Sequence, residues 1–139
     1  MRLNRSENGA VLMPKRVCAA LLKEAELSGH DECCGLILGE SGQITAIAPA
    51  RNVHPAPKTR FEIDPQTLVD AHRAERAGGP QVLGYYHSHP LGSSLPSDTD
   101  RANAPRDGRV WAIIGYDGLR FWEDAEDGFR ALSYEVVER

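Results

Sequence analysis

The sequence predicts an α+β fold: a mixed β-sheet of about six or seven strands flanked by two or three helices. Three observations support this prediction. Apolar residues recur at helical spacing in some segments and form short or alternating runs of strand length in others. No internal repeat divides the 139 residues. With 41% hydrophobic and 26% charged residues, the chain is long enough to bury one core, so we expect a single domain over residues 1–139.

In the first half of the chain, a short apolar run stops at Pro14, which suits the first turn of a helix because that position needs no N–H. Apolar residues then recur at helical spacing until Ser28-Gly29 ends the pattern. Strands are predicted where compact or alternating apolar runs are bounded by turn residues. The predicted strands of this half are 33–39, 44–48 and 61–63.

The second half begins with a clear helix start. Asp64 suits the N-cap and Pro65 the first helical position, and Gly78-Gly79 ends that helix. A loop rich in glycine, serine and proline precedes a short helix predicted over about 97–104. The predicted strands of this half are 82–87, 110–115, 119–122 and about 131–137.

Bulk properties exclude several classes of protein. The net charge is −4 with both signs interspersed, whereas nucleic-acid binding needs a basic patch, so no nucleic-acid partner is expected. No apolar run is long enough to span a membrane, and residues 1–9 lack a charged-then-apolar leader. The three cysteines do not suit a disulfide framework, since two are adjacent, and we expect a cytoplasmic protein. The acidic stretch 123–127 is interpreted as a solvated loop.

A pair of histidines lies where a predicted buried strand runs into a loop, in the sequence His87-Ser88-His89-Pro90. Residues two apart in a strand project from the same face, so both imidazoles are expected to point the same way. Imidazole is the commonest metal-ligand side chain, and a catalytic zinc needs three protein ligands and one open position. The pair therefore predicts two ligands of a metal site, and a third must come from nearby.

The third ligand is expected from the start of the next predicted helix, at Ser97-Asp98-Thr99-Asp100. Taken alone, S-x-x-D at a helix start is more often a cap with an acid favoured by the helix dipole. It does not stand alone, because H-x-H-P, six residues and then S-x-x-D has a chance frequency of roughly 3 × 10⁻⁷ per start position. Spacing leaves both Asp98 and Asp100 open as the ligand.

These motifs resemble the JAMM (MPN+) zinc metalloproteases, whose signature is H-x-H-x7-S-x-x-D. The family also carries an acid just before a C-G-L-L-x-G-like strand, which corresponds here to Glu32 followed by 33–39. The stretches Arg51–Val53 and Phe61–Pro65 resemble the small bacterial members. The resemblance covers about 31–116, and it implies the MPN/JAMM fold with a cytidine-deaminase-like core.

The resemblance implies a role for each matching residue. His87, His89 and Asp100 would hold one Zn²⁺ per chain, Glu32 would be the general acid/base, and Ser97 would help to stabilise the oxyanion. Asp100 is favoured over Asp98 on the family pattern. The chemistry is sound, since zinc polarises the scissile carbonyl and one oxyanion donor is worth about 3 kcal/mol.

The resemblance also implies the substrate. Small bacterial members act on ubiquitin-like or sulfur-carrier proteins, cleaving the amide after a C-terminal Gly-Gly tail. The long insertions of eukaryotic deubiquitinating members are missing, which argues against ubiquitin itself. Dimers occur among relatives, so a homodimer is one open option.

Three other hypotheses are kept. A non-catalytic MPN scaffold would only bind proteins and would need no stoichiometric zinc. A zinc hydrolase of a small amide would use the same site on another substrate. A thiol site would use Cys33 or Cys34, but neighbours in a strand face opposite ways and buried cysteines are usually packing residues.

Overall fold

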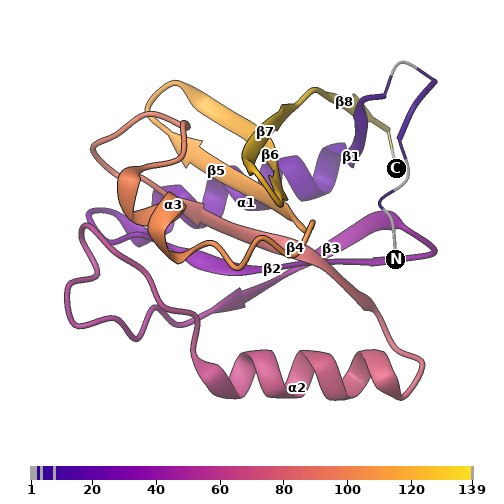
Figure 1. Cartoon of the computed structure of the whole chain (residues 1–139), viewed down its shortest axis with the longest axis horizontal. Coiled ribbons are helices and arrows are strands. Elements are labelled where there is room, and N and C mark those ends of the chain that lie inside the picture. Colours follow the sequence, from indigo (N-terminus) through magenta and orange to yellow (C-terminus); the bar gives the residue numbers. More distant parts are fainter. Residues whose placement is uncertain (1–2, 4, 8, 139) are drawn as a thin grey trace.

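The computed structural model describes residues 3, 5–7 and 9–138. Its helices are α1 (Lys15–Ser28), α2 (Pro65–Arg76) and α3 (Asp98–Asn103). Its strands are β1 (Val11–Pro14), β2 (Cys34–Glu40), β3 (Gln43–Ala50), β4 (Gln81–Ser88), β5 (Val110–Gly115), β6 (Gly118–Ala125), β7 (Gly128–Leu132) and β8 (Tyr134–Val137). Six strands form a mixed sheet in the order β3-β2-β4-β5-β6-β7, and β1 and β8 form a separate pair (Figure 1). The predicted α+β class is confirmed.

Helices α1 and α2 cover opposite faces of the six-stranded sheet (Figure 1). On one face, Val17 and Leu21 of α1 pack in a core that includes Ile37 of β2. On the other face, Leu68 of α2 packs in a core that includes Leu36 of β2. Successive residues of β2 therefore enter different cores, as the alternation of a strand requires. A strand buried on both faces needs apolar residues throughout, which explains the unbroken run in its sequence.

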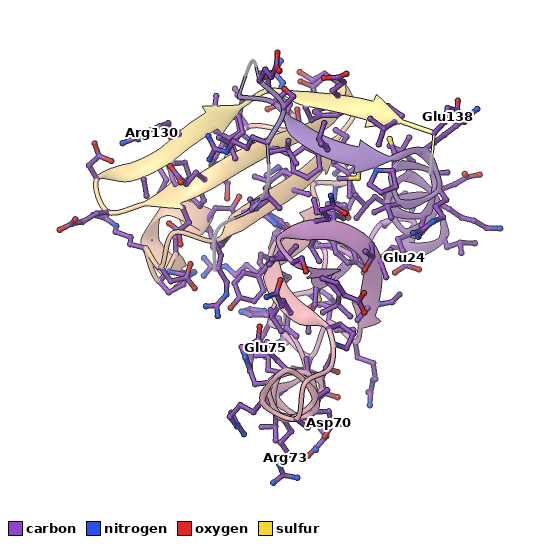
Figure 2. The ribbon with its side chains drawn as sticks, turned by 90° about the vertical axis from the view of Figure 1, so that its right-hand side faces the viewer. Glu24, Asp70, Arg73, Glu75, Arg130 and Glu138 are labelled. Atoms are coloured by element: carbon purple, nitrogen blue, oxygen red, sulfur yellow. The ribbon has the colours of Figure 1, made fainter. Side chains whose placement is uncertain are left out.

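The outer surface of α2 is charged. Asp70 and Arg73 project from this helix away from the sheet (Figure 2), and Asp70 accepts a hydrogen bond from the side chain of Gln66 at 2.8 Å. Asp64 caps the helix by accepting from Gln66 N at 3.1 Å, and Pro65 occupies its first turn, as predicted. None of the helices in the described part of the chain has the length and apolar character needed to cross a lipid bilayer.

Two predicted strands differ from the structure in extent. Of the strand expected over 61–63, only Ile63 pairs, in an isolated bridge with Asn52. The strand expected over 131–137 is two strands, because β7 pairs with β6 whereas β8 pairs in parallel with β1. The change of sheet occurs at Ser133, whose carbonyl accepts from Val11 N at 2.8 Å. A partner at the other end of the chain leaves no trace in the local sequence pattern.

The interpretation of 123–127 as a solvated loop is right for Glu126 and Asp127, which form an exposed turn, and wrong for the three residues before them. Glu123–Ala125 complete β6, and the Asp124 side chain is fully buried. Asp124 accepts the backbone N–H of Arg106 at 2.8 Å, so its carboxylate fixes the segment that leads into β5. A buried carboxylate needs such a donor, and this donor comes from a loop that the sequence pattern does not connect to β6.

Strand β4 lies in the middle of the sheet and positions the predicted site. It pairs antiparallel with β2 and parallel with β5, and residues 89–109, which include α3, make the connection to β5. His87 is opposite Cys34 of β2 and Ile113 of β5. The last residues of β4, the first residues of β2 and the loop before α3 therefore lie together where these inner strands end.

Candidate active site

His87, His89 and Asp100 converge on one point. The two Nε2 atoms lie 3.1 Å apart, and each lies 3.1 Å from Asp100 Oδ2. The His87 side chain is fully buried and that of Asp100 is 4% exposed. The strand alternation that predicted a shared direction for the two imidazoles thus places both ring nitrogens against the same carboxylate.

Helix α3 aims Asp100 at the histidines through its capping box. Asp100 N donates to Ser97 Oγ at 3.0 Å, and Ser97 N donates to Asp100 Oδ2 at 2.9 Å. The cap and the contact with the imidazoles therefore use the same carboxylate. Asp98 has a fully exposed side chain that lies 3.9 Å from Arg101, and its contacts are outside the cluster.

Different contacts fix the two imidazoles. His89 Nδ1 lies 2.6 Å from the Ser93 carbonyl oxygen, which can only accept, so Nδ1 carries the proton and a neutral ring presents its Nε2 lone pair to the cluster. His87 is held by packing: the Phe61 ring stacks on it at 4.3 Å between centroids, and the Trp111 ring meets it edge-on at 5.5 Å.

The cluster fits a metal cation. A carboxylate oxygen and two imidazole lone pairs at 3.1 Å repel one another unless a proton or a metal ion lies among them. Burial lowers the pKa of His87, which disfavours protonation of that ring. Burial also acts to raise the pKa of Asp100, but the contacts of its carboxylate with the His87 and His89 rings outweigh burial and hold that pKa well below its usual range. Two nitrogens and one anionic oxygen form a suitable donor set for zinc and similar divalent metals.

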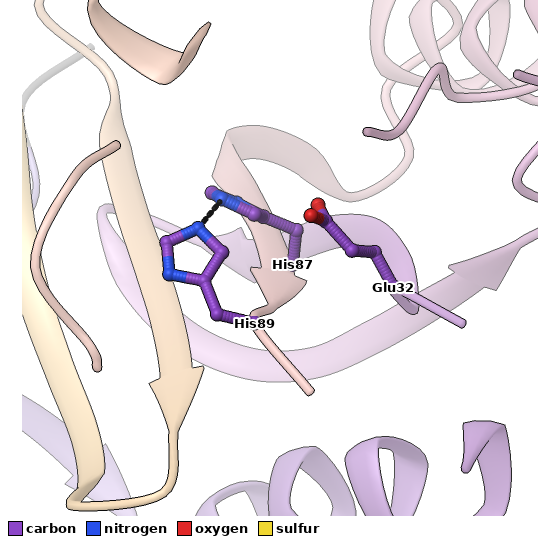
Figure 3. Close-up of side chains that lie close together, drawn as sticks. All are labelled: Glu32, His87 and His89. Carbon is purple, nitrogen blue, oxygen red and sulfur yellow. Dashed lines mark hydrogen bonds between the residues drawn. The ribbon is translucent and has the colours of Figure 1, made fainter. Parts of the chain in front are cut away.

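Glu32 lies beside this cluster, just before β2. Its carboxylate points toward the imidazole pair (Figure 3), and one oxygen lies within 4.8 Å of a ring nitrogen of each histidine. The residue is 6% exposed. Its backbone is fixed by a hydrogen bond from Glu32 N to Pro57 O at 2.7 Å. Cys33 N donates to Ser88 Oγ at 2.9 Å, which ties the same segment to the end of β4.

The position of Glu32 changes its acidity. Burial raises the pKa of its carboxyl from 4.5 to about 7, with a smaller opposing effect from His89 and a small further increase from Asp100. A carboxyl group with a pKa near 7 can exchange a proton readily at neutral pH. A buried acid with this property beside two imidazoles is typical of a catalytic site.

We expect the buried Glu32 to make the stability of the metal-free protein depend on pH. The folded-state pKa of about 7 lies above the unfolded value of 4.5, so the contribution of Glu32 is most favourable below the unfolded value and is lost as pH rises through 7. We therefore compare the free energy of unfolding of wild type with that of Glu32→Gln. The difference, wild type minus variant, should decrease as the pH rises from 4.5 to about 7 and stay constant at higher pH. Urea denaturation of both proteins over this range measures it. A flat difference would contradict the raised pKa.

Asn52 organises the loop that surrounds Glu32. Its Nδ2 donates to the carbonyl oxygens of Glu32 and Arg60, both at 3.0 Å, and its Oδ1 accepts from His54 N and Glu62 N, both at 3.1 Å. All four hydrogen bonds join backbone groups that have no partner in a regular strand. The Asn52 side chain thus supplies hydrogen bonds to backbone groups that would pair with a neighbouring strand if 61–63 formed a complete strand.

Replacing Asn52 with alanine is expected to destabilise the fold by ~2 kcal/mol, because partly exposed hydrogen bonds each contribute about 0.5–1 kcal/mol. Asn52→Asp keeps the two acceptor contacts but sets a carboxylate oxygen against the carbonyl oxygens of Glu32 and Arg60, so it should not restore the stability of wild type. The free energy of unfolding of metal-free protein measures both. Equal stability of the alanine variant and wild type would show that the loop is held by other contacts.

The two adjacent cysteines are packing residues. Cys33 belongs to the core on the α1 face and Cys34 to the core on the α2 face, as strand alternation predicts. Burial raises the pKa of the Cys33 thiol to about 11 and that of Cys34 to about 12. A thiol that keeps its proton is neither a nucleophile nor a metal ligand. The thiol hypothesis has no support in this geometry.

A cleft of about 570 Å³ opens beside Glu32 and Asp100. Aromatic and aliphatic side chains dominate its walls: Phe61, Ile63, Pro65, Leu68, Tyr85, Pro105 and Trp111. A larger cavity of about 1020 Å³ lies at the other end of β4, beside Gln81 and Val82, and none of the predicted site residues lines it. Of the two cavities, the smaller cleft is therefore the one that the predicted site residues line.

Sequence reasoning missed the contacts that hold the site together. Asn52 and Phe61 appeared in segments resembling the small bacterial family members, but nothing in their spacing predicts a loop hub or a ring stacked on His87. The Ser93 carbonyl has no sequence signal, because any residue supplies a carbonyl. Trp111 is both buried and part of the cleft wall, a combination that its sequence position does not reveal.

The fold and the buried cluster of two histidines and two carboxylates are those expected of a hydrolase of the JAMM type, and the cluster is its candidate metal site. The family model described as prokaryotic homologs of the JAB domain matches residues 14–125, and the chain belongs to this family. The chain is 38% identical over 108 residues to a desampylase of Haloferax volcanii, covering 76% of this chain and 78% of that protein. It is 39% identical over 102 residues to a probable TtuB-protein conjugate cleaving protease of Thermus thermophilus, covering 73% and 65%.

Solved structures agree on the fold. A protein from Desulfitobacterium hafniense matches with a TM-score of 0.80 and 23% identity, covering 92% of this chain and 93% of that one. A JAB1/MPN domain protein from Archaeoglobus fulgidus matches with a TM-score of 0.65 and 21% identity, covering 92% and 100%. A structure described as a JAMM metalloprotease-like zinc site in the proteasome and signalosome matches with a TM-score of 0.61 and 20% identity, with the same coverage. The predicted MPN/JAMM fold is confirmed.

Proposed function

We propose that the chain is a zinc-dependent isopeptidase that hydrolyses the amide bond after the C-terminal Gly-Gly of a ubiquitin-like or sulfur-carrier protein. The observation that carries this proposal is the convergence of His87, His89 and Asp100 within 3.1 Å beside a buried glutamate. The relatives described as a desampylase and as a conjugate cleaving protease support the substrate class. Each chain would hold one zinc ion.

His87, His89 and Asp100 are the residues that would hold the metal. When bound, zinc supplies a Lewis acid that polarises a carbonyl and makes water more acidic. Glu32 would accept a proton on a carboxylate oxygen from the attacking water, and then deliver it to the leaving nitrogen. Its distance of up to 4.8 Å from the ring nitrogens is one that a water molecule can bridge.

Ser97 would donate its hydroxyl hydrogen to the substrate oxygen as negative charge develops there. The capping box supports this role, because Ser97 Oγ already accepts from Asp100 N at 3.0 Å and keeps its own hydrogen for another acceptor. The cap also holds this oxygen close to the cluster.

The burial of the site favours a glycine tail. His87 is fully buried and Glu32 is 6% exposed, so side chains beside the scissile bond would meet the walls of the cleft. Two glycines carry no side chain and let an extended backbone approach closely. The apolar walls around Tyr85 and Trp111 would contact the residues that precede the glycines.

The test is to incubate zinc-loaded protein with a carrier protein joined through its Gly-Gly tail to a peptide or a lysine side chain, alongside small amides. Mass spectrometry should show the carrier released with a free glycine carboxylate. Replacing the second glycine with valine should block cleavage. Hydrolysis of the small amides alone would favour a small-amide hydrolase, and binding of carrier without turnover or stoichiometric zinc would favour a scaffold.

A further inference from the structure

The loop that follows β4 is held by the hairpin of β5 and β6. Tyr116 N donates to Gly92 O at 2.9 Å, and Trp122 Nε1 donates to Ser94 O at 3.0 Å. Gly115 approaches so closely that a Cβ atom there would overlap the backbone of the loop. The path of the loop beside His89 is therefore set by residues of a hairpin that contributes nothing directly to the metal cluster.

One peptide unit of this loop is hydrogen-bonded at both ends. The Ser93 carbonyl accepts from His89 Nδ1 at 2.6 Å, and the Ser94 N–H donates to Asp117 Oδ1 at 2.8 Å. The carbonyl and the N–H belong to the same planar peptide, so fixing one end fixes the direction of the other. Asp117 lies in the β5–β6 turn, and its side chain is 27% exposed and 3.7 Å from Arg120.

The contact also changes the strength of the carbonyl as an acceptor. A carboxylate that accepts a peptide N–H polarises the peptide, because hydrogen bonds in a chain strengthen one another. The Ser94 N–H in turn lowers the pKa of Asp117, which keeps that carboxylate ionised. Metal-binding histidines commonly donate their other ring N–H to a carboxylate or a carbonyl. Here His89 donates to the Ser93 carbonyl, and the N–H of the same peptide donates to the Asp117 carboxylate.

We propose that Asp117 is a positioning residue that acts through the Ser93–Ser94 peptide to select the tautomer of His89 with its proton on Nδ1. This tautomer presents the Nε2 lone pair to the other two donors, His87 Nε2 and Asp100 Oδ2, each 3.1 Å away. The inference rests on the proposed function only in taking His89 as a metal ligand.

The test compares Asp117→Ala and Asp117→Asn with wild type. In metal-free protein at alkaline pH, where the imidazole is neutral, the ¹⁵N chemical shifts of His89 report which ring nitrogen carries the proton. Wild type should show one tautomer, and Asp117→Ala a mixture. The asparagine variant keeps an acceptor oxygen without the charge, so it should lie between them. Zinc affinity, measured by competition with a chromophoric chelator, should fall about 10-fold in the alanine variant.

Asp127→Ala is the matched control, since Asp127 is an acid in the next hairpin turn, 3.4 Å from Arg130. It should leave both the tautomer and the zinc affinity unchanged. A single His89 tautomer with wild-type zinc affinity in folded Asp117→Ala and Asp117→Asn would overturn the proposal, as would an equal loss of affinity in Asp127→Ala. Neither measurement uses a substrate, so failure of conjugate cleavage would leave this inference standing, and the reverse also holds.

Discussion

Glu32→Gln is expected to lower the turnover of a Gly-Gly conjugate by about 10³-fold while the bound zinc stays at the wild-type level, since a positioned general acid/base typically contributes 10²–10⁴-fold. The amide has the size of the carboxylate but does not take up a proton. Glu32 has an oxygen within 4.8 Å of a ring nitrogen of both histidines, and the other acid beside them, Asp100, already contacts both rings. Steady-state kinetics and metal analysis of the same preparation measure the two quantities.

Glu62→Gln is the matched control, because Glu62 lines the same cleft and only its backbone N–H is tied to Asn52. Turnover within twofold of wild type is expected for this variant. If Glu32→Gln kept full activity, Glu32 would not be the general base. If it lost zinc instead, Glu32 would be a metal ligand, a role that its position beside both imidazoles also allows.

The parts of the site that the sequence predicted are those fixed by local geometry. His87 and His89 lie on one strand end, where a two-residue spacing fixes the direction of both side chains. Ser97 and Asp100 lie on one helix start, where a three-residue spacing forms a capping box. Local rules place each pair, and the meeting of the two pairs follows from the loop that joins them.

The position of Glu32 beside the histidines cannot be predicted from local sequence rules. Glu32 lies far from the histidines in the sequence, and its approach to them depends on the pairing of β2 with β4, opposite Cys34 and His87. Without the family resemblance it would be a solvated acid before a strand. Its burial also depends on Asn52 and Pro57, which bind its backbone from a segment without regular structure.

The role proposed for Asp117 is even harder to predict from the sequence than that of Glu32. Asp117-Gly118 is a typical turn sequence, and it lies where β5 turns into β6. Its contact with Ser94 requires two loops to meet, and only the backbone of Ser93 and Ser94 takes part. Backbone groups are the same for every residue, so no pattern of side chains predicts which peptide lies between Asp117 and His89.

Asp100→Ala is expected to abolish zinc binding and turnover together, whereas Asp98→Ala should change neither. Asp100 is 4% exposed and lies 3.1 Å from both imidazoles, and Asp98 is fully exposed on the same turn of α3. Loss of one of three ligands should weaken zinc binding by more than the roughly 10–100-fold that loss of a ligand's hydrogen-bond partner costs. Chelator competition and kinetics on both variants measure it, and zinc loss in Asp98→Ala alone would reverse the assignment.

Alanine at position 100 also removes half of the capping box, so a distorted α3 must be separated from a missing ligand. Asp100→Asn makes this separation, because its side-chain oxygen can still accept from Ser97 N, as the carboxylate does at 2.9 Å. The charge that balances a cation between the two imidazoles is lost in this variant. If the carboxylate is a ligand, the asparagine variant should keep the cap of α3 and still bind zinc weakly. If the carboxylate is only a cap, the asparagine variant should bind zinc as wild type does.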